Sequence, residues 1–283
     1  MKDKIDKDEV NSLQNAKMEF PTWKGLFNEY LVEAMQSDYP SIHFGNKPMK
    51  KSDNTLTIVR GTPKLQKIIS GHEFVGIDVP VLLNPQKGRS GKTIVIVGES
   101  PLRDTKDKNP NDILLGTPYA IHQEFGCPPQ CNVYKKIISD LLAEDYSIYL
   151  TDIIKVWWQG KKGKEMKVND IDKDLWEKEI EMIKKGKYGI GKDVFIVAWG
   201  KTAKKELNKI AEYKNKFKPI LHPGLMNWNN WKLHIFEKAI YEKKDINYAK
   251  KVYPNIGDST TEVIVANEAV EEIFEYCSKT NIL

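Results

Sequence analysis

The sequence has few of the features that mark secreted or membrane proteins. Only 3 of its 283 residues are cysteine, which is too few for a disulfide scaffold and suits a reducing cytoplasm. No apolar run approaches the roughly 18 residues that a membrane span needs. The N-terminus, MKDKIDKDEV, is charged and lacks the apolar segment of a signal peptide. We therefore expect a cytoplasmic protein that has no membrane partner.

Arginine is also scarce, because only Arg60, Arg89 and Arg103 stand among the 44 Lys and Arg residues. With 39 Asp and Glu the formal net charge is +5. This small excess permits a polyanionic partner if the lysines cluster on one face, but simple solubility explains it equally well. The hydrophobic (40%) and charged (29%) fractions are those of an ordinary globular protein, which argues against wholesale disorder.

Short apolar runs alternate with helical stretches from residue 93 onward. Strands are predicted at 93–97, 147–154, 193–199 and 218–222, and helices at 133–143, 175–185, 202–211, 231–243 and 267–277. This order predicts an α/β fold over residues 91–283, with a three-layer α/β/α arrangement and a central four-stranded, mostly parallel sheet. Residues 1–90 are expected to form a mainly helical N-terminal extension, with one helix capped by Thr22.

Polar residues follow the predicted strands at the points where the strands end. Glu99 comes after the first strand, Asp152 lies in the second, Lys201 follows the third and His222 follows the fourth. In open α/β sheets ligands bind beyond the carboxyl ends of the strands. We therefore expect Glu99, Asp152 and His222 to converge at one edge, joined by Tyr119 from the loop between the first two strands.

Each of these residues also has a purely structural interpretation. Glu99 can cap a helix, and Asp152 can bind the amides of its own loop. His222 can be a satisfied loop histidine, and Tyr119 can pack on the core. Convergence of all of them on one edge favours a functional site.

Five motifs in order resemble the uracil-DNA glycosylase superfamily, especially its family 4 branch, over roughly residues 93–240. They are Gly98-Glu99-Ser100-Pro101, Gly116-Thr117-Pro118-Tyr119, Thr151-Asp152-Ile153-Ile154-Lys155, Trp199-Gly200-Lys201-Thr202-Ala203 and His222-Pro223-Gly224. Each motif is weak by itself, but all five stand in order at predicted strand ends. The resemblance implies a metal-free enzyme that flips a base out of DNA and hydrolyses its N-glycosidic bond.

The resemblance also implies roles for individual residues. Glu99 would orient or activate the attacking water, and His222 would donate a hydrogen bond to the pyrimidine O2. Tyr119 would stack on the flipped base, and Asp152 would read its Watson–Crick edge. Ser100, placed with the base-binding residues, stands where some branches carry a catalytic Asp or Asn. The catalytic load would therefore fall on Glu99, or the rate of excision would be low.

Lysines beside tryptophans suit the backbone of DNA. The residues predicted to contact DNA are Lys155, Trp157, Trp158, Lys161, Lys162, Lys201, Asn227 and Trp228. The alternative is that these tryptophans merely cover the core.

The most informative departure from the family pattern is Asp152, which replaces a base-reading Asn. An ionised carboxylate only accepts hydrogen bonds, so it suits an exocyclic amine such as cytosine N4. A modified cytosine, such as the hydroxymethylated or glucosylated cytosine of phage DNA, is the favoured target, and anti-phage defence is the implied role. The small Gly224 and the 103–115 loop would make room for a 5-substituent. A protonated Asp152 would still read uracil, so repair of uracil remains open.

The remaining signals concern cofactors and rival functions. Cys127, Cys131 and Cys277 are too few for a four-cysteine iron–sulfur cluster, and a zinc site would lack a clear fourth ligand, so no cofactor is expected. A DNA-binding protein that has lost catalysis is one rival. A nucleotide- or sugar-processing enzyme is another, weakened because no phosphate-binding glycine loop follows the first strand. No obligate protein partner is inferred.

Overall fold

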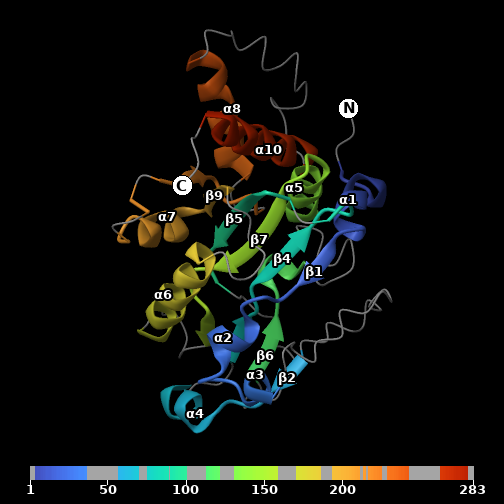
Figure 1. Ribbon diagram of the computed structural model, residues 1–283. Coiled ribbons are helices and arrows are strands. Elements are labelled where there is room, and N and C mark those ends of the chain that lie inside the picture. Colours follow the sequence, from blue (N-terminus) through green and yellow to red (C-terminus); the bar gives the residue numbers. More distant parts are fainter. Residues whose placement is uncertain are drawn as a thin grey trace.

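The computed structural model describes residues 4–36, 57–69, 75–88, 90–100, 113–121, 131–158, 170–185, 193–210, 213–214, 216–224, 228–241 and 262–279 (Figure 1). No helix among these residues is long and apolar enough to cross a membrane.

The main sheet has six strands. In spatial order they are β1 (Lys17–Glu19), β4 (Val81–Asn84), β7 (Ser147–Asp152), β5 (Lys92–Gly98), β9 (Asp193–Trp199) and β10 (Lys218–Ile220). The last four run parallel to one another, whereas β4 pairs antiparallel with β7 and β1 antiparallel with β4. The predicted α/β fold and its mostly parallel sheet are confirmed. The prediction of four strands omitted the two that the N-terminal residues add at the β7 edge.

Helices cover both faces of this sheet (Figure 1). Strand β5 shows why, since its apolar residues alternate between two cores. Ile94 and Ile96 belong to the core that includes residues of α5 (Cys131–Ala143) and α10 (Glu262–Lys279). Val95 and Val97 belong to the core that includes residues of α6 (Asp170–Lys184) and α7 (Lys201–Leu207). A strand buried on both faces has a continuous apolar sequence, and the apolar run at 93–97 therefore predicts this strand.

A second sheet takes two of its four strands from the N-terminal third of the chain. Its strands, in order, are β2 (Thr57–Val59), β6 (Ile113–Gly116), β3 (Val75–Asp78) and β8 (Val156–Trp158). The short helices of this region are η1 (Lys7–Val10), α1 (Asn11–Gln14), α2 (Trp23–Phe27), α3 (Val32–Gln36) and α4 (Pro63–Ile69). The remaining elements are η2 (Pro118–Ala120) and α8 (Trp228–Tyr241). Residues 1–90 therefore carry the expected helices but also supply strands to both sheets.

Three local predictions are corrected. Thr22 does precede α2, but its side chain makes no cap hydrogen bond and instead contacts the Tyr149 hydroxyl at 3.1 Å. Helix α7 spans Lys201–Leu207 rather than the predicted 202–211, and Gly200 at its N-cap takes a φ of +94° that a side chain would disfavour. Strand β7 ends at Asp152 rather than residue 154, and the next two amides still donate to the carbonyls of Gly98 and Glu99 at the end of β5.

Candidate functional site

The carboxyl ends of β5 and β7 bring two predicted site residues together. Gly98 pairs with Asp152 in the register of these strands. A Cβ added to Gly98 would overlap the Tyr119 hydroxyl and the Asp152 Oδ1, and would lie 2.9 Å from Tyr119 Cζ. The two oxygens are therefore near neighbours over the bare backbone of residue 98. Glycine is needed here for close approach.

Aromatic rings continue the site from Tyr119 toward His222. The Tyr119 ring lies edge-on to Trp199 with centroids 4.7 Å apart, and 5.1 Å from the ring of Tyr134 on α5. Tyr134 stacks on Trp199 at 5.7 Å and meets the His222 ring edge-on at 5.7 Å. Asp152, Tyr119 and His222 thus stand along one continuous cluster, as the strand-end argument predicts.

Tyr119 is held in an unusual backbone conformation. Its φ is +58°, a left-handed value that non-glycine residues seldom adopt. The residue as a whole is half-buried, but its hydroxyl is buried and has no hydrogen-bond partner among the described residues. Burial, together with the negative charge of Asp152, raises the pKa of this phenol well above its usual value. The hydroxyl is therefore a neutral donor beside Asp152.

His222 is fixed as a neutral hydrogen-bond donor. The Gly224 N–H donates to its Nδ1 at 3.2 Å, which leaves the ring proton on Nε2. Burial lowers the pKa of His222 below its usual 6.5. The backbone is held as well, since the Trp231 indole N–H of α8 donates to the His222 carbonyl at 3.4 Å. An Nε2–H donor of this kind suits a developing negative charge on a substrate oxygen.

These features predict the titration of His222. We expect its ¹⁵N NMR signals to show the Nε2–H tautomer with a midpoint below 6.5, and His222→Gln assigns the signals. Because the folded pKa is lowered, the unfolded chain binds the proton more tightly. The stability that this group contributes is therefore complete above pH 6.5 and is lost as the pH falls through the folded pKa. An Nδ1–H tautomer or a midpoint above 6.5 would contradict this assignment.

Glu99 and Ser100 lie just past the end of β5, as predicted. The Glu99 side chain is exposed, and Ser100 is half-buried. The backbone of Glu99 is anchored, because its carbonyl accepts a hydrogen bond from the Ile154 N–H at 3.0 Å. The preceding carbonyl, that of Gly98, accepts one from the Ile153 N–H, also at 3.0 Å. This combination places an accessible carboxylate on a fixed main chain at the edge of the site.

The structure gives Gly224 another role than the one expected of it. A Cβ there would lie 3.0 Å from His222 Nδ1 and 3.1 Å from the Tyr134 hydroxyl. The absent side chain thus makes way for His222 and Tyr134 rather than for a 5-substituent. Of the 103–115 loop, residues 103–112 lie outside the described part, and 113–115 belong to β6.

Lys155 corrects one of the DNA-binding predictions. Its side chain is fully buried and forms an ion pair of 2.5 Å with Glu179 on α6. An ammonium in this position cannot reach a DNA phosphate. A lysine in sequence is ordinarily a surface residue, and only the apolar residues on both sides of Lys155 hinted at its burial.

The other predicted DNA contacts have mixed outcomes. Trp157 is buried in β8 with 8% exposure, so its ring belongs to the core, as the alternative interpretation had it. Lys201 is exposed at the start of α7, directly after the carboxyl end of β9. The side chains of Trp158 and Trp228, and the whole of Lys161, Lys162 and Asn227, lie outside the described part of the structure.

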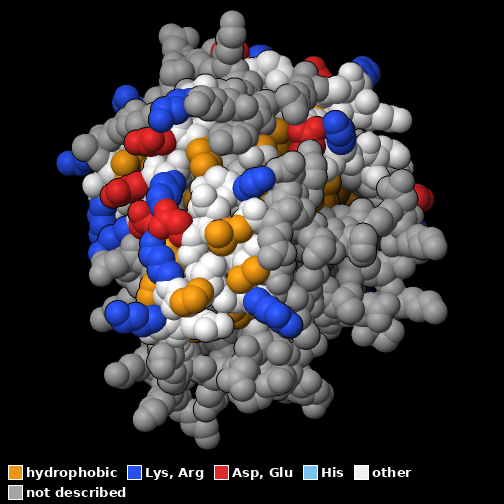
Figure 2. Space-filling model, turned by 60° about the horizontal axis from the view of Figure 1, so that its bottom comes forward, with side chains coloured by type: hydrophobic (Ala, Val, Ile, Leu, Met, Phe, Trp, Pro, Cys, Tyr) orange, Lys and Arg blue, Asp and Glu red, His pale blue; other side chains and the backbone are white. Residues whose placement is uncertain are grey.

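The described lysines do not form an unbroken basic patch on the face shown in Figure 2, where Lys and Arg side chains stand among Asp and Glu. Pairing of this kind is seen at Glu29, which binds Lys64 at 2.5 Å and Lys178 at 2.8 Å. Both lysines lower the pKa of Glu29 to about 2.

Sequence reasoning missed three residues of this site. Tyr134 looked like a core position of a predicted helix, and Trp199 like the end of a buried strand. Asp78 ends β3 opposite Gly116, is buried, and contributes to the raised pKa of Tyr119. Its strand is only four residues long, so no periodic pattern marked it.

Comparisons with protein-family models, with curated proteins and with solved structures give no match to this chain. Within the described residues, no group of three or more His, Cys, Asp or Glu side chains could hold a metal ion.

Proposed function

We propose that this protein is a DNA glycosylase that flips a pyrimidine out of DNA and hydrolyses its N-glycosidic bond, with a modified cytosine as the target. The observation that carries this is the joint placement of Asp152, Tyr119 and neutral His222 along one aromatic cluster at the carboxyl edge of a parallel sheet. The five motifs that resemble the uracil-DNA glycosylase superfamily supply the reaction class. Cytoplasmic location and a role against phage DNA belong to the same proposal.

The chemistry follows from charge. As the bond between the sugar C1′ and the base nitrogen breaks, the sugar becomes cationic and the base anionic. The exposed Glu99 carboxylate accepts a proton from the attacking water, whose oxygen bonds to C1′. The Nε2–H of His222 stabilises the negative charge on the pyrimidine O2. The base leaves with the electron pair of the broken bond and takes up a proton from solvent.

Recognition of the base rests on Asp152 and Tyr119. The Asp152 carboxylate accepts a hydrogen bond from an exocyclic amine, which cytosine carries and uracil lacks. Tyr119 as a whole is only partly buried, and stacking of its ring on the flipped base is part of the proposal. Stacking and edge contacts offset the few kcal/mol that flipping costs. Exposed Lys201 lies next to the site and suits a DNA phosphate.

The test is an abasic-site assay on duplex and single-stranded DNA that contains uracil, cytosine, hydroxymethylcytosine or glucosylated hydroxymethylcytosine. Wild type is expected to excise modified cytosine. Asp152→Asn is expected to lose preference for the amine-bearing base over uracil by about 5- to 150-fold, the worth of one good edge contact. Asp193→Asn, at the opposite end of β9, is the matched control and should keep wild-type selectivity.

The outcomes separate the rival functions. Uracil excision by wild type would overturn the cytosine assignment but keep the glycosylase. Retained DNA binding without an abasic product on any substrate would overturn the enzyme and favour a DNA-binding protein of the same fold.

A further inference from the structure

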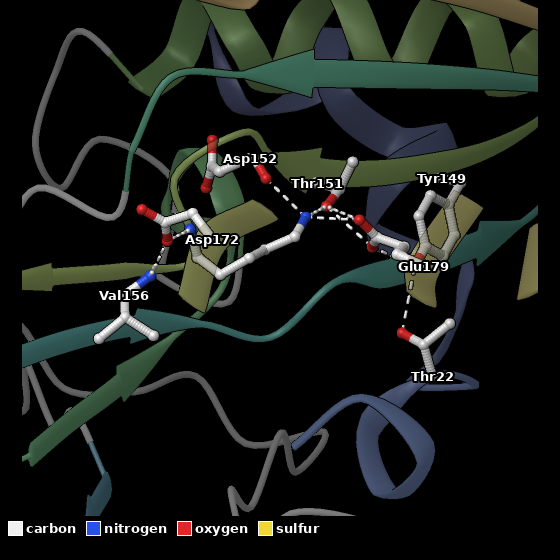
Figure 3. A network of polar contacts seen from close by, with 8 residues as sticks. Thr22, Tyr149, Thr151, Asp152, Val156, Asp172 and Glu179 are labelled. Atoms are coloured by element: carbon white, nitrogen blue, oxygen red, sulfur yellow. Dashed lines mark hydrogen bonds and ion pairs between the residues drawn. The ribbon is translucent and has the colours of Figure 1, made fainter. Parts of the chain in front are cut away.

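A buried polar network lies directly beneath the proposed base-reading residue (Figure 3). Its centre is the Lys155 ammonium, which donates to Glu179 Oε2 at 2.5 Å, to the Asp152 carbonyl at 2.5 Å and to the Thr151 hydroxyl. An ammonium has three N–H donors, and all three are used here. The Trp176 ring lies 4.9 Å from the Nζ and completes the enclosure.

The network joins β7, α6 and the N-terminal segment. Glu179 accepts hydrogen bonds from Tyr149 at 2.6 Å and Thr151 at 2.9 Å, both on β7. Because the Tyr149 hydroxyl donates to Glu179, the Thr22 hydroxyl is the donor in its 3.1 Å contact with Tyr149. The N-terminal segment is thus joined to the same network, through the residue that precedes α2.

The turn that carries Lys155 is bound at both of its ends. Asp172 on α6 accepts the N–H groups of Lys155 at 2.7 Å and Val156 at 3.1 Å. On the other side, the amides of Ile153 and Ile154 donate to the Gly98 and Glu99 carbonyls at 3.0 Å. Through these hydrogen bonds, the turn of residues 152–156 links the main chain of Asp152 to that of Glu99.

We infer that Lys155 is a positioning residue that, with Glu179, fixes the main chain of Asp152 and, through the 152–156 turn, that of Glu99. The catalytic consequence of this inference rests on the proposed function, but the anchoring of the main chain does not depend on any substrate. A buried ion pair is often no more stable than an apolar replacement, so a structural role alone does not explain its presence. Binding the Asp152 carbonyl is what an apolar pair could not do.

The test separates anchoring from stability. Lys155→Met alone leaves Glu179 buried without its cation, so the thermal midpoint should fall by about 10 °C or more. The double variant Lys155→Met/Glu179→Gln removes both charges but keeps an oxygen acceptor for Tyr149 and Thr151, and should recover at least half of that loss. Lys178→Met on the same helix is the control. The ion pairs of Lys178 are half-exposed and contribute little to stability, so the thermal midpoint should change little.

Amide hydrogen exchange of the double variant is the deciding measurement. We expect the Ile153 and Ile154 amides to exchange about tenfold faster or more, while those of Val95 and Val97 keep their rates. Single-turnover excision, on the base that wild type removes, should fall about 10- to 100-fold, since small misplacements of reacting groups have effects of this size. Unchanged exchange at Ile153 and Ile154, or uniformly faster exchange across the sheet, would overturn the inference.

Amide hydrogen exchange needs no substrate, so the proposed function and the anchoring role of Lys155 can be tested separately. If wild type excises no base but the double variant shows the local exchange change, the proposed function is wrong and the anchoring stands. If wild type excises a base and the double variant does so equally fast, the ion pair is structural only.

Discussion

Glu99→Gln is expected to slow base excision by about 100- to 10,000-fold, the usual contribution of a positioned general base. Glutamine has nearly the same shape as glutamate but cannot take a proton from water. The main chain of residue 99 is held by the Ile154 N–H, and the side chain is exposed, so the fold should be unaffected. Single-turnover excision, measured with the protein in excess over DNA, reports the chemical step directly.

The matched control is Glu144→Gln, an exposed carboxylate that lies just after α5 and before the start of β7. It should leave both excision and melting unchanged. Thermal melting of Glu99→Gln should also match wild type. If Glu99→Gln excises at the wild-type rate, another group activates the water, and Ser100, the next residue, is then the first to replace.

The strands of the main sheet that are buried on both faces could be predicted from sequence. Apolar β-branched runs such as 93–97 have few other interpretations, and each ends in a polar or glycine residue. The strands β1 and β4 could not be predicted, because three or four residues form no pattern and pair only with segments far away in sequence. Their place at the β7 edge comes from tertiary pairing.

The residues of the candidate site likewise divide into those that the sequence predicts and those that it does not. Asp152, Glu99 and His222 could be predicted because they stand at or just after the carboxyl ends of strands that share one edge of the sheet. Lys155 was misplaced, because whether a lysine is buried depends on an acidic partner, and Glu179 lies 24 residues away on another element. Tyr134 and Trp199 were missed because an aromatic residue that lines a site has the same local pattern as one that fills a core.

Gly98→Ala is expected to disable the site while the sheet stays intact. The new Cβ would overlap the Tyr119 hydroxyl and Asp152 Oδ1. Both groups are buried, so one or both must move, at about 1–3 kcal/mol in the free energy of unfolding. Displacing the Asp152 carboxylate, which we propose reads the base, by about 1 Å should reduce excision about 100-fold. Denaturant unfolding and single-turnover excision measure the two effects.

Gly91→Ala is the control for this change, because a Cβ at residue 91, just before β5 begins, meets nothing within 4 Å. It should leave the free energy of unfolding within about 0.5 kcal/mol of wild type and excision unchanged. Combining Gly98→Ala with Tyr119→Phe removes one of the two clashing oxygens and should return part of the lost stability. Full activity in Gly98→Ala would mean that Tyr119 and Asp152 can separate without consequence, and that the base is read elsewhere.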